Sequence, residues 1–372
     1  MSPRSVVCRV LVMLLLGSSA YAQEVQVRVL LERAHDEVRI HIDEGHRGYA
    51  DGALIFDTSL GIAWPIDSVA SEINVDGMRV GRSFMLAPHS GVVEWDGSTY
   101  RGALRFVADG DELLVVNVLG LEEYLRGVVP AEMAAAWPLE ALKAQSVASR
   151  TYTLISLEPT EPFDICATVE CQAYDGVAAE HRRSDTAIAQ TAGLVLTYGG
   201  EFAHTYYHSD SGGELASSAE VWGTPYPYLA SRVDVTSTTP HRHWRHVIDP
   251  DRMGRTLATL GHHVGTVRSL RVLAYSESGR VLRAEVAGSE GQIILGGSTL
   301  TSLLRESGFK STRFTMVGDL VARGDGFGHG VGMSQYGARS LARAGYGFEQ
   351  ILRFYYPDTL LQRLAPAHAD GS

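Results

Sequence analysis

The pattern of apolar and polar positions divides the chain into a strand-rich N-terminal part, a helical middle and a mixed C-terminal part. From residue 25 to about residue 117, short alternating or apolar runs are separated by Gly and Asp, which is typical of strands joined by turns. Around Leu121 the pattern becomes helical, and the clearest helix follows Pro138 and extends to about Ile155. The sequence therefore predicts a strand-rich α+β fold with a few helices and mixed sheets.

One face of the helix after Pro138 combines small residues with two cations. At 3.6 residues per turn, Ala144 and Ala148 fall on a buried stripe, while Lys143 and Arg150 lie along one edge of it. These cations either face solvent or line a cleft that holds a carboxylate or a sugar.

Strand-like segments return over residues 187–205 and about 247–300, and a glycine-rich loop covers residues 324–332. This loop leads into two predicted helices, over about 333–344 and 348–355.

The N-terminus has the features of a secretory signal peptide. Arg4 and Arg9 are followed by an apolar run over residues 10–16 and by the small-residue site Ala20-Tyr21-Ala22, so we expect cleavage after Ala22. The run has about half the ~20 residues that a spanning helix needs. We therefore expect an exported protein, in the periplasm, cell envelope or medium, that does not span the membrane after cleavage.

The composition and charge of the chain exclude several classes of function. Hydrophobic residues make up 45% and charged residues 20% of the chain, which indicates a globular protein. The net charge of −11 argues against a nucleic-acid partner, because phosphate contacts require an excess of Lys and Arg. The glycine-rich loop lacks a following Gly-Lys-Ser/Thr, and neither Gly-x-Ser-x-Gly nor His-Glu-x-x-His occurs. We expect no required cofactor.

Glu132 is a candidate general acid. None of the ten residues around it is charged. Burial in such surroundings raises the pKa of a carboxyl group, so that it can hold a proton near neutral pH and donate it to a leaving oxygen. The alternative is a solvent-facing Glu at a helix start beside Trp137.

Cys166 and Cys171 are the two cysteines that follow the signal peptide. In an oxidising compartment, such a close pair forms either a disulfide or half of a metal site. Glu170 and His181 are candidates to complete a zinc site.

Five motifs occur in order from the middle of the chain to its C-terminal part. They are YLRGVVPAEM (124–133), EALKAQSVASRTY (140–152), CQAY (171–174), YHSDSGG (207–213) and GHGVGMSQYGA (328–338). On these motifs, residues 100 to about 358 resemble the stage II sporulation protein D (SpoIID/LytB) family.

The resemblance implies a peptidoglycan lytic transglycosylase, although some relatives are described as enhancers of cell-wall amidases. Glu132 falls on the family's catalytic acid. The implied reaction cleaves the glycosidic bond between N-acetylmuramic acid and N-acetylglucosamine and leaves a 1,6-anhydro end. Because the sugar's own 6-hydroxyl is the nucleophile, a second carboxylate is dispensable. The residues implied to line the glycan groove are Lys143, Gln145, Arg150, His208, Ser209, Ser211, His329 and Gln335.

The resemblance also bears on the cysteines. Some members bind zinc through Cys and His in this segment, whereas Glu170 stands here where those members have His. We therefore expect either a disulfide or a structural zinc at Cys166 and Cys171.

Two alternatives to this transglycosylase remain open. The chain is either a non-catalytic, wall-binding enhancer of an N-acetylmuramoyl-L-alanine amidase, or a glycosidase in which Asp210 or Asp325 is a second carboxylate beside Glu132.

The expected organisation has six parts. They are a signal peptide (1–22), an N-terminal strand-rich region (23–99), a SpoIID-like catalytic core (100–235), a second strand-rich region (236–318), a C-terminal loop and helices that complete the core (319–363), and a tail (364–372).

Overall fold

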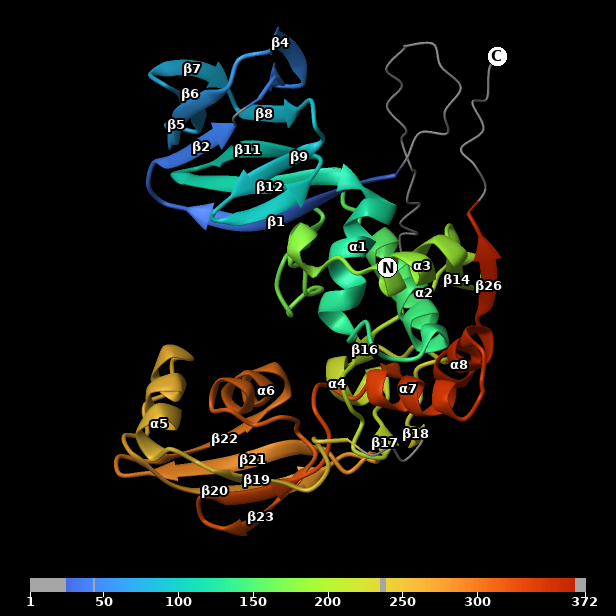
Figure 1. Cartoon of the computed structure of the whole chain (residues 1–372). Coiled ribbons are helices and arrows are strands. Elements are labelled where there is room, and N and C mark those ends of the chain that lie inside the picture. The colour runs from blue at the N-terminus through green and yellow to red at the C-terminus, as the bar shows by residue number, and fades with distance from the viewer. Residues whose placement is uncertain (1–24, 43, 235–238, 365–372) are drawn as a thin grey trace, which may run out of the picture.

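The structure is a computed structural model that describes residues 25–42, 44–234 and 239–364. The predicted signal peptide and residues 365–372 of the predicted tail lie outside these ranges. The described residues form eight α-helices and 26 strands in several sheets, which confirms the strand-rich α+β class. In Figure 1, one set of sheets lies at each end of a curved molecule, and most of the helices lie between them.

The N-terminal part consists of a seven-stranded sheet and a four-stranded sheet that share one core. The larger sheet has the order β13-β1-β12-β11-β8-β3-β4, and the smaller one has the order β2-β5-β6-β7. Side chains along a strand point alternately to its two faces, and β8 accordingly buries every second residue against this core. Ile66 and Ile73 of the smaller sheet meet Phe84 and Leu104 of the larger one, and all four are fully or almost fully buried.

The strands of this part have the following bounds: β1 Gln26–Ala34, β2 Val38–Ile42, β3 His46–Ala50, β4 Ala53–Thr58, β5 Ile62–Val69, β6 Glu72–Val75, β7 Met78–Gly81, β8 Ser83–Pro88, β9 Val92–Trp95, β10 Ser98–Arg101, β11 Ala103–Asp109, β12 Glu112–Gly120 and β13 Ile165–Cys166.

Helix α2 (Leu139–Ile155) lies at the centre of the helical region. It contacts α1 (Leu121–Glu132), α3 (Arg182–Gln190), α7 (Gln335–Arg343) and α8 (Phe348–Tyr355). Ala144 and Ala148 are fully buried, and such small side chains let neighbouring helices approach closely. One hydrophobic cluster joins them to Val331 and Tyr355, so segments roughly 200 residues apart share a core.

Short strands pair with one another within this region. Their bounds, with those of α4 and one 3₁₀ turn, are: turn Gly176–Ala179, β14 Leu194–Tyr198, β15 Glu201–Phe202, β16 Tyr207–His208, β17 Glu214–Leu215, α4 Ser218–Trp222, β18 Arg232–Val233, β25 Met333–Ser334 and β26 Leu360–Arg363.

Residues 244–324 form a second strand-rich part with its own hydrophobic cluster. Two three-stranded sheets, β20-β21-β22 and β19-β24-β23, belong to it. Its elements are β19 Trp244–Val247, α5 Pro250–Thr259, β20 Val267–Tyr275, β21 Val281–Gly288, β22 Gln292–Gly296, α6 Gly297–Glu306, β23 Phe314–Gly318 and β24 Val321–Gly324.

The structure has three helices in stretches that the sequence pattern predicted as strands, so that part of the prediction was wrong. Helix α3 begins before the stretch 187–205 and occupies its first residues, and α5 and α6 lie in or across the stretch 247–300. Asp249 caps α5 through its side chain, and Pro250 follows at the first helical position, so the sequence does contain a start signal for this helix.

Within the described ranges, no helix is long and apolar enough to cross a membrane.

Candidate active site

A cavity of about 690 Å³ lies beside the C-terminal end of α1. One part of its wall comes from α1, α2, residues 169–171, the segment 206–209, α4 and the glycine-rich loop, and the other from residues between 276 and 282, α6 and residues 309–312. Of the predicted site residues, six line it: Glu132, Cys171, His208, Ser209, His329 and Gln335.

Glu132 ends α1, and both of its carboxyl oxygens are held. The backbone N–H of Ala173 donates to Oε1 at 2.8 Å, and Nε2 of Gln335 donates to Oε2 at 3.2 Å. Burial raises the pKa of Glu132, while hydrogen bonds from Ala173, Gln335 and the Tyr207 hydroxyl pull it down, and the charge of Asp175 adds a small upward effect. The effect of burial is the largest and the net pKa is raised, so the carboxyl group keeps its proton to a higher pH than an exposed Glu.

The segment that carries Ala173 is fixed by the buried side chain of Gln172. The hydroxyls of Tyr124 and Thr153 donate to its Oε1 at 3.2 and 3.0 Å, and its Nε2 donates to the carbonyl of Ser149 at 3.3 Å. Gln172 is fully buried, so these bonds are protected from water. They hold the segment that presents the Ala173 N–H to Glu132.

His208 and His329 are both neutral at ordinary pH. Burial lowers the pKa of His208 well below its usual value and that of His329 to about 4. His329 accepts at Nδ1 from the Val331 N–H at 3.0 Å, so its proton sits on Nε2, which donates to the Tyr207 carbonyl at 2.9 Å. His208 donates from Nδ1 to the Val331 carbonyl at 3.1 Å, which leaves its buried Nε2 as a lone-pair acceptor with no partner among the described residues.

Close backbone approach explains the glycines of the loop around His329. Strand β16 pairs in parallel with β25, which directly follows this loop. Gly332 has φ 73°, and a Cβ there would lie 1.9 Å from the Tyr206 carbonyl. Only glycine fits that position, so the loop can wrap the segment that carries His208.

Two family models match parts of this chain. The family described as stage II sporulation protein (SpoIID) matches residues 109–198, and a domain of unknown function (DUF8618) matches residues 237–332. An uncharacterized protein of Brachyspira hyodysenteriae is 30% identical over 267 residues, which cover 70% of this chain and 72% of that protein. This chain belongs to the SpoIID/LytB family.

Two further relatives come from Bacillus subtilis. Its amidase enhancer is 30% identical over 78% of this chain, and the match covers 49% of the enhancer's own length. Its stage II sporulation protein D is 29% identical over 66% of this chain and 75% of that protein. The cavity draws its wall from both matched segments of this SpoIID/LytB chain, from residues 206–209 and 220–222 between them, and from Gln335 beyond them.

The cysteines of this SpoIID/LytB member form a disulfide between Cys166 and Cys171. The neighbouring candidates for zinc are engaged elsewhere: Glu170 pairs with Arg305 at 3.1 Å, and Nδ1 of His181 caps α3. No group of three or more His, Cys, Asp or Glu residues that could hold a metal occurs in the described part of the chain. These residues therefore do not fit a structural zinc site.

Lys143 and Gln145 do not line the cavity. The Lys143 ammonium pairs with Glu140 one helical turn away at 2.7 Å. Nε2 of the fully buried Gln145 donates to the Ser149 hydroxyl at 3.0 Å. Their predicted place in the glycan groove is therefore corrected: the motif that contains them builds the helical core.

Arg150 is also displaced from the groove. Its guanidinium is fully buried and makes two 2.7 Å bonds to the carboxylate of Glu122, with a further bond of 3.2 Å to the Leu194 carbonyl. The carboxylate that Arg150 binds thus belongs to the protein. Arg150 joins α2 to α1 and β14 instead of contacting a ligand.

Ser211 is buried and donates to Asp234 at 2.6 Å, so its predicted contact with glycan is replaced by a structural one. The two candidate second carboxylates also lie outside the cavity wall. Asp210 accepts from the Gly212 N–H at 2.8 Å, and Asp325 contacts His243 at 3.0 Å. In this structure, neither aspartate joins Glu132 in one cavity.

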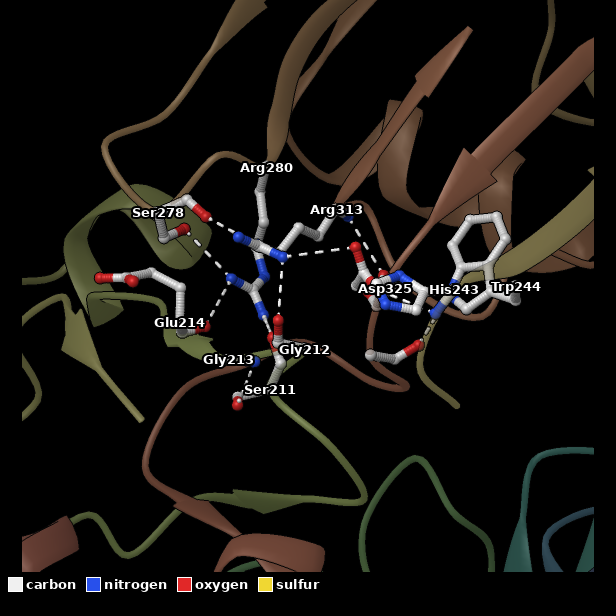
Figure 2. Close-up of polar contacts among 12 residues, drawn as sticks. Ser211, Gly212, Gly213, Glu214, His243, Trp244, Ser278, Arg280, Arg313 and Asp325 are labelled. Carbon is white, nitrogen blue, oxygen red and sulfur yellow. Dashed lines mark hydrogen bonds and ion pairs between the residues drawn. The ribbon is translucent and has the colours of Figure 1, made fainter. Parts of the chain in front are cut away.

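Two arginines connect residues 211–214 to the second strand-rich part, as Figure 2 shows. The buried guanidinium of Arg280 donates to the carbonyls of Ser211 and Glu214 at 3.0 and 3.1 Å. Arg313 donates to the Gly212 carbonyl at 2.9 Å. Sequence reasoning missed Arg280, because its partners are backbone carbonyls more than 60 residues away.

Proposed function

We propose that this protein acts on the bacterial cell wall as an exported peptidoglycan lytic transglycosylase, with Glu132 as its general acid and base. The observation that carries the proposal is the setting of Glu132, a carboxyl group in a cavity wall whose pKa is raised by burial. The SpoIID match and the names of the two Bacillus subtilis relatives support a role at the cell wall.

In the first step, protonated Glu132 donates its proton to the glycosidic oxygen next to N-acetylmuramic acid. The bond from C1 to that oxygen breaks, and positive charge develops on C1 and the ring oxygen. Glu132 becomes a carboxylate at this moment. Donors from Ala173 and Gln335 then stabilise the new negative charge.

In the second step, the 6-hydroxyl of the same sugar attacks C1 and gives its proton to Glu132. A 1,6-anhydro ring forms, and the acid is restored without a water molecule. Because the nucleophile is tethered to the reacting carbon, its effective concentration is high and no second carboxylate has to activate it.

His208 is suited to orient the sugar. Its Nε2 lone pair has no protein partner in the described ranges, and the residue lies in the cavity wall. A hydroxyl or acetamide N–H of the glycan would satisfy this acceptor. Ser209 and Gln335 complete the proposed polar contacts, whereas His329, whose two ring nitrogens are bonded within the protein, would contact the sugar through its ring.

The test compares the mature protein with its Glu132→Gln variant on purified glycan strands, with and without stem peptides. Mass spectrometry should detect anhydromuramic ends with the wild type and none with the variant. Glu170→Gln is the matched control, because Glu170 also lines the cavity but is paired with Arg305. Absence of anhydro ends with the wild type on both substrates would refute the proposal.

A second candidate function is stimulation of a cell-wall amidase, which the name of the Bacillus subtilis relative favours. This function requires binding to the wall and to the amidase but no chemistry at Glu132. Amidase release of stem peptides should then rise equally with the wild type and with Glu132→Gln. A rise that depends on Glu132 would exclude a purely non-catalytic role.

Export is part of the proposal. A secreted protein whose first residue is Gln23 would support cleavage after Ala22. Retention of residues 1–22 in the mature protein would contradict it.

A further inference from the structure

Two large aromatic side chains in the cavity wall are unusually exposed. Trp222 at the end of α4 is 45% exposed, and Phe327 in the glycine-rich loop is 44% exposed. Leaving this much aromatic surface in water is unfavourable, and exposed apolar surface in a concave site commonly marks a place where a ligand binds.

Both rings are held in place by their neighbours. The Trp222 ring lies with its centroid 4.4 Å from that of Tyr206 and 5.1 Å from that of His329. The backbone of Phe327 exchanges two hydrogen bonds with Asp210, of 3.0 and 2.8 Å, and its ring contacts His241. Rigid aromatic surfaces bind with little loss of conformational entropy.

A series of aromatic contacts connects Trp222 with the proposed acid. Tyr207, whose hydroxyl bonds Glu132, lies 6.3 Å from Tyr152 between ring centroids, and Tyr152 lies 6.1 Å from Tyr206. Tyr206 in turn contacts Trp222. The exposed tryptophan therefore belongs to the same wall as Glu132.

We propose that Trp222 and Phe327 are stacking platforms for sugar rings of a β-linked amino-sugar polymer that runs through the cavity. A pyranose ring whose substituents are equatorial presents axial C–H groups on its faces, and these carry partial positive charge. The face of an aromatic ring is negative, so the two surfaces attract in addition to burying apolar area.

Both platforms lie close to the histidine pair. Trp222 adjoins His329, Phe327 lies two residues before it, and His208 lies 5.3 Å from His329 between ring centroids, so sugars on both rings would be near the unpartnered Nε2 of His208. Polar groups fix orientation and aromatic faces supply affinity, as in other ligand pockets. The inference rests on the proposed function for the identity of the polymer, but it concerns binding alone.

The test measures binding without turnover. In the Glu132→Gln protein, we would titrate a hexamer of N-acetylglucosamine and peptide-free glycan strands in a calorimeter. Adding Trp222→Ala or Phe327→Ala should weaken binding on the order of tenfold, while Trp222→Phe should weaken it less. Phe202→Ala is the matched control, because Phe202 is 37% exposed and lies outside the cavity wall.

Unchanged binding in both alanine variants, or an equal loss in Phe202→Ala, would overturn the inference. Binding of an amidase, but not of sugar, that depends on the two rings would also overturn it. Should Trp222→Ala fail to fold in a thermal scan, Trp222→Phe and Phe327→Ala still decide the question.

Kinetics separate this inference from the proposed reaction. In the otherwise wild-type protein, each alanine substitution should raise KM and leave kcat nearly unchanged. Sugar binding that needs both rings but yields no anhydro ends would support the platforms and refute the transglycosylase. Formation of anhydro ends with an unaltered KM in both alanine variants would support the transglycosylase and refute the platforms.

Discussion

The side chain of Glu132 experiences two opposing influences on its pKa. Burial favours the neutral acid, whereas the donors from Ala173, Gln335 and Tyr207 favour the carboxylate. The proposed reaction needs both forms in turn, since Glu132 would first lose and then regain a proton. An environment that raises the pKa moderately, and still offers donors to the anion, suits this double role.

This balance predicts the pH dependence of cleavage. The proposed first step needs protonated Glu132, so kcat/KM should fall as pH rises through its raised pKa. Gln335→Ala removes a donor that lowers this pKa, so the alkaline limb should move to higher pH. His329, with a pKa of about 4, stays neutral over this limb and should contribute only an acid limb near that pH. A pH-rate profile checks this, and a limb shifted to lower pH in Gln335→Ala would contradict it.

At the scale of elements, the pair between Arg150 of α2 and Glu122 of α1 holds the helical core. Glu122→Gln would leave the fully buried guanidinium without its counter-charge. We expect a loss of about 3 kcal/mol in the free energy of unfolding, near the lower end for buried pairs, because Glu122 is itself 36% exposed. Denaturant titration measures this.

The control for this prediction is Glu37→Gln, which removes an exposed pair with Arg39 and should cost less than about 1 kcal/mol. Cleavage per folded molecule should stay unchanged in Glu122→Gln. If Glu122→Gln instead had wild-type stability but no longer bound sugar, the result would indicate that Arg150 contacts the glycan.

The Cys166–Cys171 disulfide closes a short loop just before Ala173, which donates to Glu132. Replacing both cysteines with serine should lower the free energy of unfolding by about 2 kcal/mol, the chain-entropy value for so short a loop. Cleavage should also slow, because the Ala173 N–H is held less firmly.

Thiol titration and metal analysis of the unreduced protein test the disulfide itself. We expect neither free thiols nor stoichiometric zinc. Two free thiols, or one zinc per chain, would contradict the disulfide.

Sequence patterns predicted some elements well and others poorly, for physical reasons. The helices around Leu121 and after Pro138, and the one ending at Tyr355, carry strong periodicity or clear start signals, and the structure contains them. Helices α5 and α6 are short and lie between strong strand patterns, which dominated the interpretation of that region. Arg150 could not be placed from sequence, because its partner Glu122 is 28 residues away and only the fold brings them together.

On the scale of the whole molecule, the candidate site depends on segments that are far apart in sequence. Glu132 and Gln335 meet across 203 residues, and α6 contributes to the same cavity wall. Isolation of Glu132 among apolar residues was visible in the sequence. Its donors Ala173 and Tyr207 were not predicted, since their contacts arise only when these segments converge.

The side chain of Arg280 connects residues 211–214 with the second strand-rich part of the chain. Arg280→Met would leave the carbonyls of Ser211 and Glu214 without their donor and loosen the loop beside the histidines. We expect kcat/KM to fall on the order of tenfold in a protein that remains folded. Arg271→Met, which removes an exposed pair with Glu285 in the same sheet, is the control and should be nearly wild type. Full activity in Arg280→Met would contradict this positioning role.

The central claim is that Glu132 moves a proton while the sugar supplies its own nucleophile. Cleavage of purified glycan strands in water enriched with oxygen-18, followed by mass spectrometry of the new ends, tests this claim most directly. The account predicts anhydro ends that contain no heavy oxygen, and no product at all with Glu132→Gln. Reducing ends that carry one heavy oxygen would show that water attacks, and would contradict it.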